Sequence, residues 1–404
     1  MTPQPTLRMI PFHPNVGQSA LGLITDGYSL WERSRLEWRV GDPGDPAQLA
    51  SQFLNRHGLG MPDPSVREDA ITESDRPVDD APVASLFVSA AAGASMIGAV
   101  PGAPTPAPAV PDLVVVVYSR SVIADGPTAP SGLGQGEWRL GPWTDSWSAH
   151  EHAQAVRQVR AAIARGDVYQ VNVVGHAAAR YRGDPMPALR RLIALPGAAH
   201  GGVLVGQGWA LASASPELLV RVEGGIVETR PIKGTRRATP AGRTDLIGSV
   251  KERAEHVMIV DLERNDLAHI AHTGTVDVPE LFAVRQWCDL WQAESRVVAR
   301  LADDVDLVDL LRALCPGGSV TGAPKLAALR EIAALEPVGR GASMGALGWL
   351  DARRLELGLT IRTAAVDGDR VHLWAGGGIT WDSDPDAEVA EAAAKAAPLR
   401  AALL

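Results

Sequence analysis

Two apolar runs near the C-terminal end of the chain, at 356–366 and 370–374, are separated only by Asp367-Gly368-Asp369. A link this short with a central glycine predicts a β-hairpin, which joins antiparallel strands. Further strand-like runs occur at 168–176 and 202–205, with helical segments between them. Hairpin-linked strands with interspersed helices favour an antiparallel α+β fold over a doubly wound parallel sheet.

Helices are predicted where apolar periodicity meets the residues that start and stop helices. Gly166 closes one such segment, Pro316-Gly317-Gly318 closes another, and Pro324 suits the first turn of a third. Asp384 is a candidate N-cap for the last helix, which begins near Pro385. The predicted helices are 149–165, 250–270, 306–314, 324–335 and the last one from Pro385.

The 404 residues include 38 Lys and Arg against 47 Asp and Glu, a formal net charge of −9. Binding to nucleic acid requires a basic surface that displaces counterions from phosphates, so this balance argues against it. The two cysteines, Cys288 and Cys315, imply no disulfide framework. The N-terminus does not resemble a signal peptide, and no apolar stretch approaches the ~18 residues that span a bilayer. We therefore expect a cytoplasmic protein without membrane segments.

The chain divides by composition into two regions. Residues 1–145 contain short apolar runs at 21–24 and 113–118, and we expect this region to contribute strands to the same body as the rest. Within it, 89–112 is dense in Ala, Gly and Pro, which predicts a flexible excursion or linker. Helical and strand patterns are tighter over 146–404.

Acidic residues recur at helical spacing in two of the predicted helices. Glu252 and Glu255 lie three residues apart, and so do Glu388 and Glu391, with Lys395 one turn further on. Each pair therefore lies on one helix face. Mg²⁺ binds through one or two protein carboxylates together with waters and substrate oxygens, so the pairs are candidate ligands. The alternative is a solvated face, with Glu391 and Lys395 forming an exposed ion pair.

Lys233 stands out among the basic residues because Ile232 and Gly234 flank it, within Pro231 to Thr235. An isolated lysine usually faces solvent. Apolar and small neighbours would instead suit a close approach to a ligand, where a desolvated amine loses proton affinity and becomes a nucleophile. Both interpretations remain open on the residues alone.

Seven motifs occur in order along the chain, namely SPELL (215–219), ETRPIKGT (228–235), AEHVMIVDLERND (254–266), PELF (279–282), PGGSVTGAPK (316–325), IRT (361–363) and AGGGI (375–379). Together they make the chain resemble the chorismate-utilising enzymes, which include anthranilate, aminodeoxychorismate, isochorismate and salicylate synthases. The resemblance covers roughly 148–396 and implies antiparallel sheets packed as a sandwich with helices outside. It also implies that 146–404 is a chorismate-binding catalytic domain.

The resemblance also implies roles for particular residues. Glu255 and Glu391 would hold Mg²⁺, which bridges to the ring carboxylate of chorismate, with Glu252 and Glu388 nearby. The substrate carboxylates would be bound by side chains and by backbone amides that glycines leave accessible. The residues implied in carboxylate binding are Arg362, Gly376, Gly377, Gly378, Ser319 and Lys395.

Two positions divide this family by reaction. Members that add water to the ring have a general-base lysine where this chain has Gln170, so the resemblance disfavours isochorismate or salicylate formation. Anthranilate synthases usually have PIAGT, whereas aminodeoxychorismate synthases typically have PIKGT, and this chain has the lysine, Lys233. The resemblance thus implies amination of chorismate to aminodeoxychorismate, with Lys233 as nucleophile and Glu217 as general acid. The alternatives are an anthranilate synthase component I and a non-catalytic chorismate-binding regulatory subunit.

Ammonia in this family usually comes from a separate glutamine amidotransferase. Neither Cys288 nor Cys315 has the sequence context of a glutaminase nucleophile, so a partner subunit is implied. The chain also departs from its relatives at Gln292, where many have histidine, and near Ser343, where many have an aromatic residue. We expect these changes to affect substrate contacts rather than the reaction class.

Overall fold

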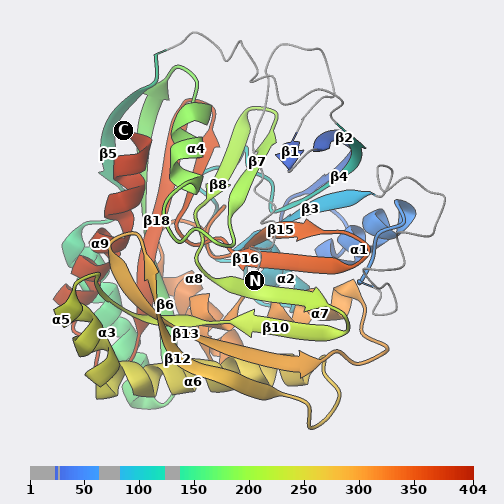
Figure 1. The fold of residues 1–404 in the computed structure, drawn as a ribbon. Helices are drawn as coiled ribbons and strands as arrows, with labels where there is room; N and C mark the ends of the chain where they lie inside the picture. Colours follow the sequence, from blue (N-terminus) through green and yellow to red (C-terminus); the bar gives the residue numbers. More distant parts are fainter. Residues whose placement is uncertain (1–22, 26–27, 63–81, 123–136) are drawn as a thin grey trace.

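The computed structural model describes residues 23–25, 28–62, 82–122 and 137–404, which form two antiparallel sheets (Figure 1). The 11-stranded sheet, sheet A, has the order β1-β2-β4-β3-β15-β16-β9-β10-β13-β11, and β12 also pairs with β13. Its strands are β1 (Leu23–Thr25), β2 (Tyr28–Trp38), β3 (Val83–Val88), β4 (Leu113–Val122), β9 (Leu218–Glu223), β10 (Ile226–Arg230), β11 (Ile232–Arg237), β12 (Asp277–Trp287), β13 (Leu290–Arg300), β15 (Ala346–Leu350) and β16 (Arg354–Leu359).

The seven-stranded sheet, sheet B, has the order β14-β6-β18-β17-β8-β7, and β5 also pairs with β6. In Figure 1 its long strands stand upright at the left, while several strands of sheet A run across the centre. Its strands are β5 (Arg139–Asp145), β6 (Gln170–Arg182), β7 (Gly202–Gly206), β8 (Trp209–Ser213), β14 (Gly322–Ala323), β17 (Thr363–Asp367) and β18 (Arg370–Ile379).

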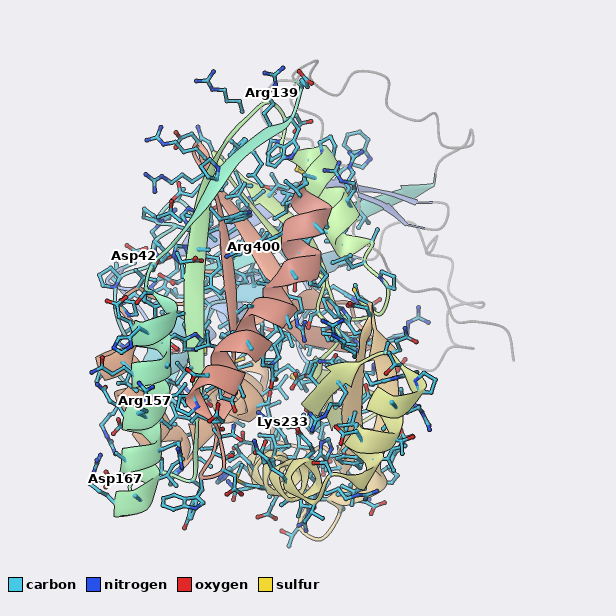
Figure 2. All side chains as sticks on the ribbon, turned by 90° about the vertical axis from the view of Figure 1, so that its left-hand side faces the viewer. Asp42, Arg139, Arg157, Asp167, Lys233 and Arg400 are labelled. Atoms are coloured by element: carbon cyan, nitrogen blue, oxygen red, sulfur yellow. The ribbon has the colours of Figure 1, made fainter. Side chains whose placement is uncertain are left out.

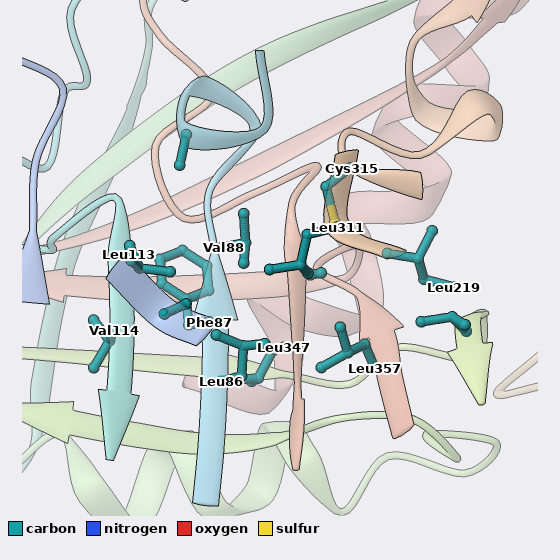
Figure 3. Packing of buried hydrophobic residues seen from close by; sticks show 14 of the residues in the cluster. Leu86, Phe87, Val88, Leu113, Val114, Leu219, Leu311, Cys315, Leu347 and Leu357 are labelled. Atoms are coloured by element: carbon teal, nitrogen blue, oxygen red, sulfur yellow. The ribbon is translucent and has the colours of Figure 1, made fainter. Parts of the chain in front are cut away.

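The core between the sheets follows from the alternation of side chains along each strand. Leu204 and Leu211 of sheet B belong to the large core cluster that also holds β3, β15 and β16, whereas Val203 and Ala212 pack in a second cluster with α4 and α9. Figure 3 shows part of the first cluster from close by, with side chains from the neighbouring strands β4, β3, β15 and β16 of sheet A lying side by side. The predicted α+β sandwich of antiparallel sheets with helices outside is thereby confirmed.

Nine α-helices are described. α3, α4 and α9 pack against sheet B, α6 packs against β11 to β13, α1 packs against β2 and β4, and α2 and α7 contact α1. The helices are α1 (Pro46–Arg56), α2 (Ala90–Met96), α3 (Ala149–Arg165), α4 (Met186–Ile193), α5 (Pro240–Gly248), α6 (Val250–Ala268), α7 (Leu307–Leu314), α8 (Lys325–Leu335) and α9 (Pro385–Leu403), with a 3₁₀ turn, η3, at Gly318–Val320.

The predicted helix signals are confirmed with small shifts. Gly166 ends α3 in the left-handed conformation, with φ 81°. The Asp384 side chain accepts from the backbone N–H groups of Asp386 and Ala387 at the start of α9. Pro324 precedes α8 as its N-cap instead of forming its first residue. None of the described helices is long and apolar enough to cross a membrane.

The hairpin predicted around Gly368 is confirmed, because β17 and β18 pair with Asp367 opposite Arg370. The single strand predicted over 356–366 is wrong. β16 ends at Leu359 in sheet A and β17 begins at Thr363 in sheet B, so the chain crosses between the sheets at 360–362. The crossing includes Arg362 with φ 54°, a conformation that strands exclude.

Residues 89–112, where we expected a flexible excursion, instead contain a capped helix and residues packed in the core. Ser89 caps α2, and Ala107 and Val110 are buried in the large core cluster. Small residues serve close packing here, because a Cβ on Gly93 would lie 2.8 Å from the backbone nitrogen of Pro316. Composition suggested a linker, but Ala and Gly also permit a helix to approach another segment closely. The strand run at 21–24 lies only partly within the described residues, as β1.

Candidate active site

One pocket contains every residue that the sequence singled out as a candidate site residue. It lies where β11, β18, α6 and α9 approach one another. Figure 2 shows Lys233 near the end of α9 that is remote from Arg400. The pocket is lined by all twelve candidates, namely Glu217, Lys233, Glu252, Glu255, Ser319, Arg362, Gly376, Gly377, Gly378, Glu388, Glu391 and Lys395.

The backbone around Lys233 is irregular in a way that affects where its side chain points. β11 pairs with β13, but the register shifts between Lys233 and Thr235. Gly234 lies in this bulge with φ 73°, and a Cβ there would meet Leu246 at 2.8 Å and Glu252 at 3.0 Å. A bulge bends the strand and redirects side chains. The sequence Lys-Gly therefore places the lysine against the turn at η3 and brings β11 close to α6.

Lys233, Ser319 and Glu217 form one hydrogen-bonded group. Lys233 Nζ donates to the Ser319 carbonyl at 3.2 Å, and Ser319 Oγ donates to Glu217 Oε1 at 2.6 Å. Burial lowers the pKa of Lys233. Burial also raises the pKa of Glu217, although the Ser319 hydroxyl acts in the opposite direction. Both directions favour a neutral amine beside a protonated acid, the combination that nucleophilic attack with leaving-group protonation requires.

Arg362 presents an unsatisfied charge to the pocket. Its side chain is buried over the ring of Trp287, with 4.2 Å between the guanidinium carbon and the ring centroid. Its Nη1 is buried without a hydrogen-bond partner among the described residues. Burial lowers the pKa of Arg362 to about 10. A buried guanidinium with a free donor fits an anionic ligand group, because unpaired burial is costly and a carboxylate would restore the lost hydrogen bonds.

Glycines on β18 keep the wall of the pocket open. A Cβ on Gly376 would lie 2.0 Å from the Val173 carbonyl oxygen, so β6 leaves no room for a side chain there. A Cβ on Gly378 would lie 2.9 Å from Lys233 Nζ, inside the space beside the amine. Lys395 Nζ donates to the Gly376 carbonyl at 3.0 Å. Backbone and lysine thus line this wall together.

The carboxylates of α6 have protein partners. Glu252 accepts from Arg236 at 2.8 Å, and Glu255 accepts from the Thr380 hydroxyl at 2.7 Å. Lys251 Nζ lies 3.7 Å from Glu255. Glu252 is buried, so the solvated face that the spacing left open is wrong for it.

The carboxylates of α9 face the same pocket from the other side. Lys395 Nζ lies 2.7 Å from Glu391 Oε1. Burial acts to raise the pKa of Glu391, but Lys395, Arg362 and Lys233 act together in the opposite direction and the pKa is lowered. Burial raises the pKa of Glu388, and the charge of Glu391 adds to this effect. The ion pair of the alternative is formed and the Glu391 side chain is 38% exposed, but Lys395 is largely buried and also bonds the backbone of β18.

The donor chemistry of this pocket suits Mg²⁺. No three His, Cys, Asp or Glu side chains of the described residues converge closely enough to hold a metal by themselves. Mg²⁺ does not need such a cage, because one or two carboxylates with substrate oxygens and waters suffice. Five glutamates face three lysines and one arginine across the pocket, so a bound dianion would gain from an added cation. Glu255 and Glu391, from opposite sides, are the residues that would hold it.

Four pocket residues lie outside the quoted motifs and were not candidates from the sequence, namely Asn172, Lys251, Met344 and Trp374. The Asn172 Oδ1 and Gln292 Oε1 atoms are buried without hydrogen-bond partners among the described residues. The sequence gives no signal that the amide side chains of these two residues are buried without a hydrogen-bond partner. Gln292 lines the pocket, whereas Ser343 is buried and donates to the Thr360 carbonyl at 3.2 Å. The departure at Ser343 therefore lies outside the pocket lining.

Comparison with known proteins identifies the family to which the chain belongs. A family model described as chorismate binding enzyme matches residues 117–401. The chain belongs to this family. Its fold resembles the crystal structure of anthranilate synthase component I from Streptococcus pneumoniae TIGR4, with a TM-score of 0.75, 24% identity, and coverage of 96% of this chain and 95% of that one. The menaquinone-specific isochorismate synthase from Escherichia coli is similar with a TM-score of 0.61 and 18% identity, covering 89% of this chain and 100% of that chain.

Curated relatives carry two different names at the same level of identity. Aminodeoxychorismate synthase component 1 of Salmonella typhimurium is 40% identical over 256 residues, covering 62% of this chain and 56% of that protein. Anthranilate synthase component 1 of Streptomyces coelicolor is 40% identical over 257 residues, covering 62% of this chain and 50% of that protein. The matches span about half the length of these relatives. Identity alone does not separate the two activities.

Proposed function

We propose that the protein aminates chorismate at ring carbon 4, as the synthase component that makes 4-amino-4-deoxychorismate. The observation that supports this most is the shared bonding of Lys233 and Glu217 to Ser319, which holds an amine and an acid in one buried pocket. Relatives named aminodeoxychorismate synthase component 1 agree with the proposal.

Substrate binding would use the cationic groups of the pocket. Chorismate carries two carboxylates, and the free donor of Arg362 and the amine of Lys395 provide two anion partners. The β18 glycines would add backbone amides, because no side chain shields them from a ligand. Bound Mg²⁺ would supply a Lewis acid that withdraws electrons from the ring through its carboxylate.

The proposed chemistry has two steps. Lys233 in its neutral form attacks ring carbon 2, both conjugated ring double bonds shift, and the bond from carbon 4 to the hydroxyl oxygen breaks. Glu217 gives its proton to that oxygen, which leaves as water, and the proton shed by the attacking amine restores Glu217. Ammonia then adds at carbon 4, both double bonds shift back, and the bond to Lys233 breaks. The proton that ammonia loses goes to the departing lysine nitrogen.

A second subunit would supply the ammonia. The relatives' names number them component 1, which implies another component. Burial raises the pKa of both cysteine thiols, to about 11 for Cys288 and about 12 for Cys315, the opposite of what a glutaminase nucleophile needs. A partner glutamine amidotransferase is therefore part of the proposal.

Product identity tests the proposed function. The purified chain, chorismate, Mg²⁺ and ammonium salt should yield 4-amino-4-deoxychorismate, which retains the enolpyruvyl group, as identified by mass and chromatography. Anthranilate together with pyruvate would establish the alternative of an anthranilate synthase component I, the activity named for the Streptomyces coelicolor relative. Chorismate binding without turnover would revive the non-catalytic regulatory subunit. Either result would contradict the proposal.

Metal dependence gives a second test. Glu391→Gln should weaken Mg²⁺ binding by at least about 10-fold, because it removes a charged oxygen that faces Glu255 across the pocket. Titration calorimetry with chorismate present and ammonium omitted would measure this without requiring turnover. The matched control is Glu223→Gln on β9, whose side chain is exposed and outside the pocket. Equal Mg²⁺ affinity in both variants would remove Glu391 from the metal site.

A further inference from the structure

Ser319 has every polar group engaged at the centre of the candidate active site. Its hydroxyl donates to Glu217 at 2.6 Å, and its carbonyl accepts from Lys233 at 3.2 Å. Its backbone N–H also interacts with the carboxyl group of Glu263 and acts to lower the pKa of that group. Since Ser319 is 4% exposed and bonded on three sides, a shift of η3 would displace both groups that the proposed reaction uses.

Glu263 lies behind this turn and not in the pocket lining. It is 3% exposed on α6, which packs directly against η3. A Cβ on Gly318 would lie 2.7 Å from Leu262 Cδ2 and 3.1 Å from Glu263 Oε1. The helix and the turn are therefore in contact with no spare space, and only glycine at 318 permits this approach.

The surroundings of Glu263 favour the neutral form of its carboxyl group. Asp266, one turn further along α6, is buried and bonded to Lys325 at 2.8 Å. Burial raises the pKa of Glu263 to about 8, and the nearby charge of Asp266 contributes. A neutral carboxyl group still offers an acceptor for a backbone N–H and avoids the cost of an isolated buried charge. Glutamine at this position would preserve both features.

We propose that Glu263 is a positioning residue that holds η3 against α6. It thereby keeps the Lys233 amine and the Glu217 carboxyl group in the positions from which both reach the bound substrate. The residue acts through Ser319 and touches no substrate itself. This inference rests on the proposed function, because that function makes Lys233 and Glu217 the reacting groups.

Two substitutions distinguish this role from a purely structural one. Glu263→Gln keeps an acceptor for the Ser319 N–H and should retain kcat within about threefold. Glu263→Leu has similar volume without the acceptor and should lower kcat by on the order of 10-fold to 100-fold, because small displacements of reacting groups are that costly. KM for chorismate should change little in both, since Glu263 does not contact the pocket. Equal kcat in the two variants would overturn the proposal.

Chemical labelling provides a readout that does not depend on the product. The chain has four lysines, Lys233, Lys251, Lys325 and Lys395, so an amine-specific reagent followed by peptide mass spectrometry can report each one. The pH midpoint of Lys233 labelling should shift in Glu263→Leu but not in Glu263→Gln, with the 39% exposed Lys251 as internal reference. Unchanged midpoints in all proteins would contradict positioning.

The labelling result also separates this inference from the proposed function. A shifted midpoint together with a wild-type product other than aminodeoxychorismate would leave the positioning role standing and the proposed function wrong. If circular dichroism shows that Glu263→Leu does not fold, Gly318→Ala provides the test instead. Its Cβ enters the same contact between α6 and η3. In Gly318→Ala we expect kcat to fall at least about 10-fold and the pH midpoint of Lys233 labelling to shift. A kcat and a midpoint equal to those of the wild type would overturn the proposal.

Discussion

Lys233→Ala is expected to lower kcat for aminodeoxychorismate formation at least about 100-fold, equivalent to roughly 2.7 kcal/mol of transition-state stabilisation. The physical reason is that the proposed first step forms a bond to this amine, and no other described amine is bonded to the Ser319 turn. Steady-state kinetics with ammonium salt would measure the loss, and chorismate binding should persist because Arg362 and Lys395 are unchanged.

Lys233→Arg is the matched control for charge. Arginine keeps a cation near Glu217 but stays protonated and does not attack carbon, so it should be as inactive as alanine. Recovery of turnover in Lys233→Arg would show that charge, and not nucleophilicity, is the contribution of this residue. Intact-mass analysis adds a direct check. With ammonium omitted, the wild type should gain the mass of chorismate less one water, and neither variant should.

The elements that could be predicted from the sequence were those with local signals. Gly368 between two apolar runs marked a hairpin, and Gly166 and Asp384 marked helix ends, because turns and caps depend on a few adjacent residues. The break at Arg362 gave no such signal. Its left-handed conformation is imposed by the crossing between sheets and its packing on Trp287, which come from distant parts of the chain.

In the candidate site, too, some features have a local sequence signal and others depend on distant parts of the chain. The carboxylate spacing at Glu252 and Glu255 placed both on one helix face, but whether that face was buried depended on β11 and its bulge at Gly234. Glu263 also lies in a motif of the sequence, yet nothing local connects it to Ser319. Their contact is created only when α6 packs on η3, so it could not be predicted before the fold was known.

Glu217→Gln should lower kcat by about 100-fold, because an amide cannot protonate the departing hydroxyl group. The pH profile gives the sharper test. Lys233 must be neutral, so activity rises with pH through its pKa, which burial lowers from 10.5. Glu217 must be protonated, so activity falls as pH rises through its pKa, which burial raises from 4.5. The need for a protonated Glu217 thus makes kcat/KM fall at alkaline pH, and Glu217→Gln should lose this fall while keeping the rise that depends on Lys233.

Ser319→Ala is the companion variant, because it removes the hydroxyl that donates to Glu217 but leaves the carboxyl group. That hydrogen bond favours the ionised form and acts to lower the pKa of Glu217, so its loss should raise this pKa further. The alkaline limb should then move to higher pH in Ser319→Ala, opposite to the direction expected if solvent entered and reduced the burial of Glu217. An alkaline limb that stays fixed in Ser319→Ala and survives in Glu217→Gln would assign it to another group. In that case the proton for the leaving oxygen must come from elsewhere in the pocket.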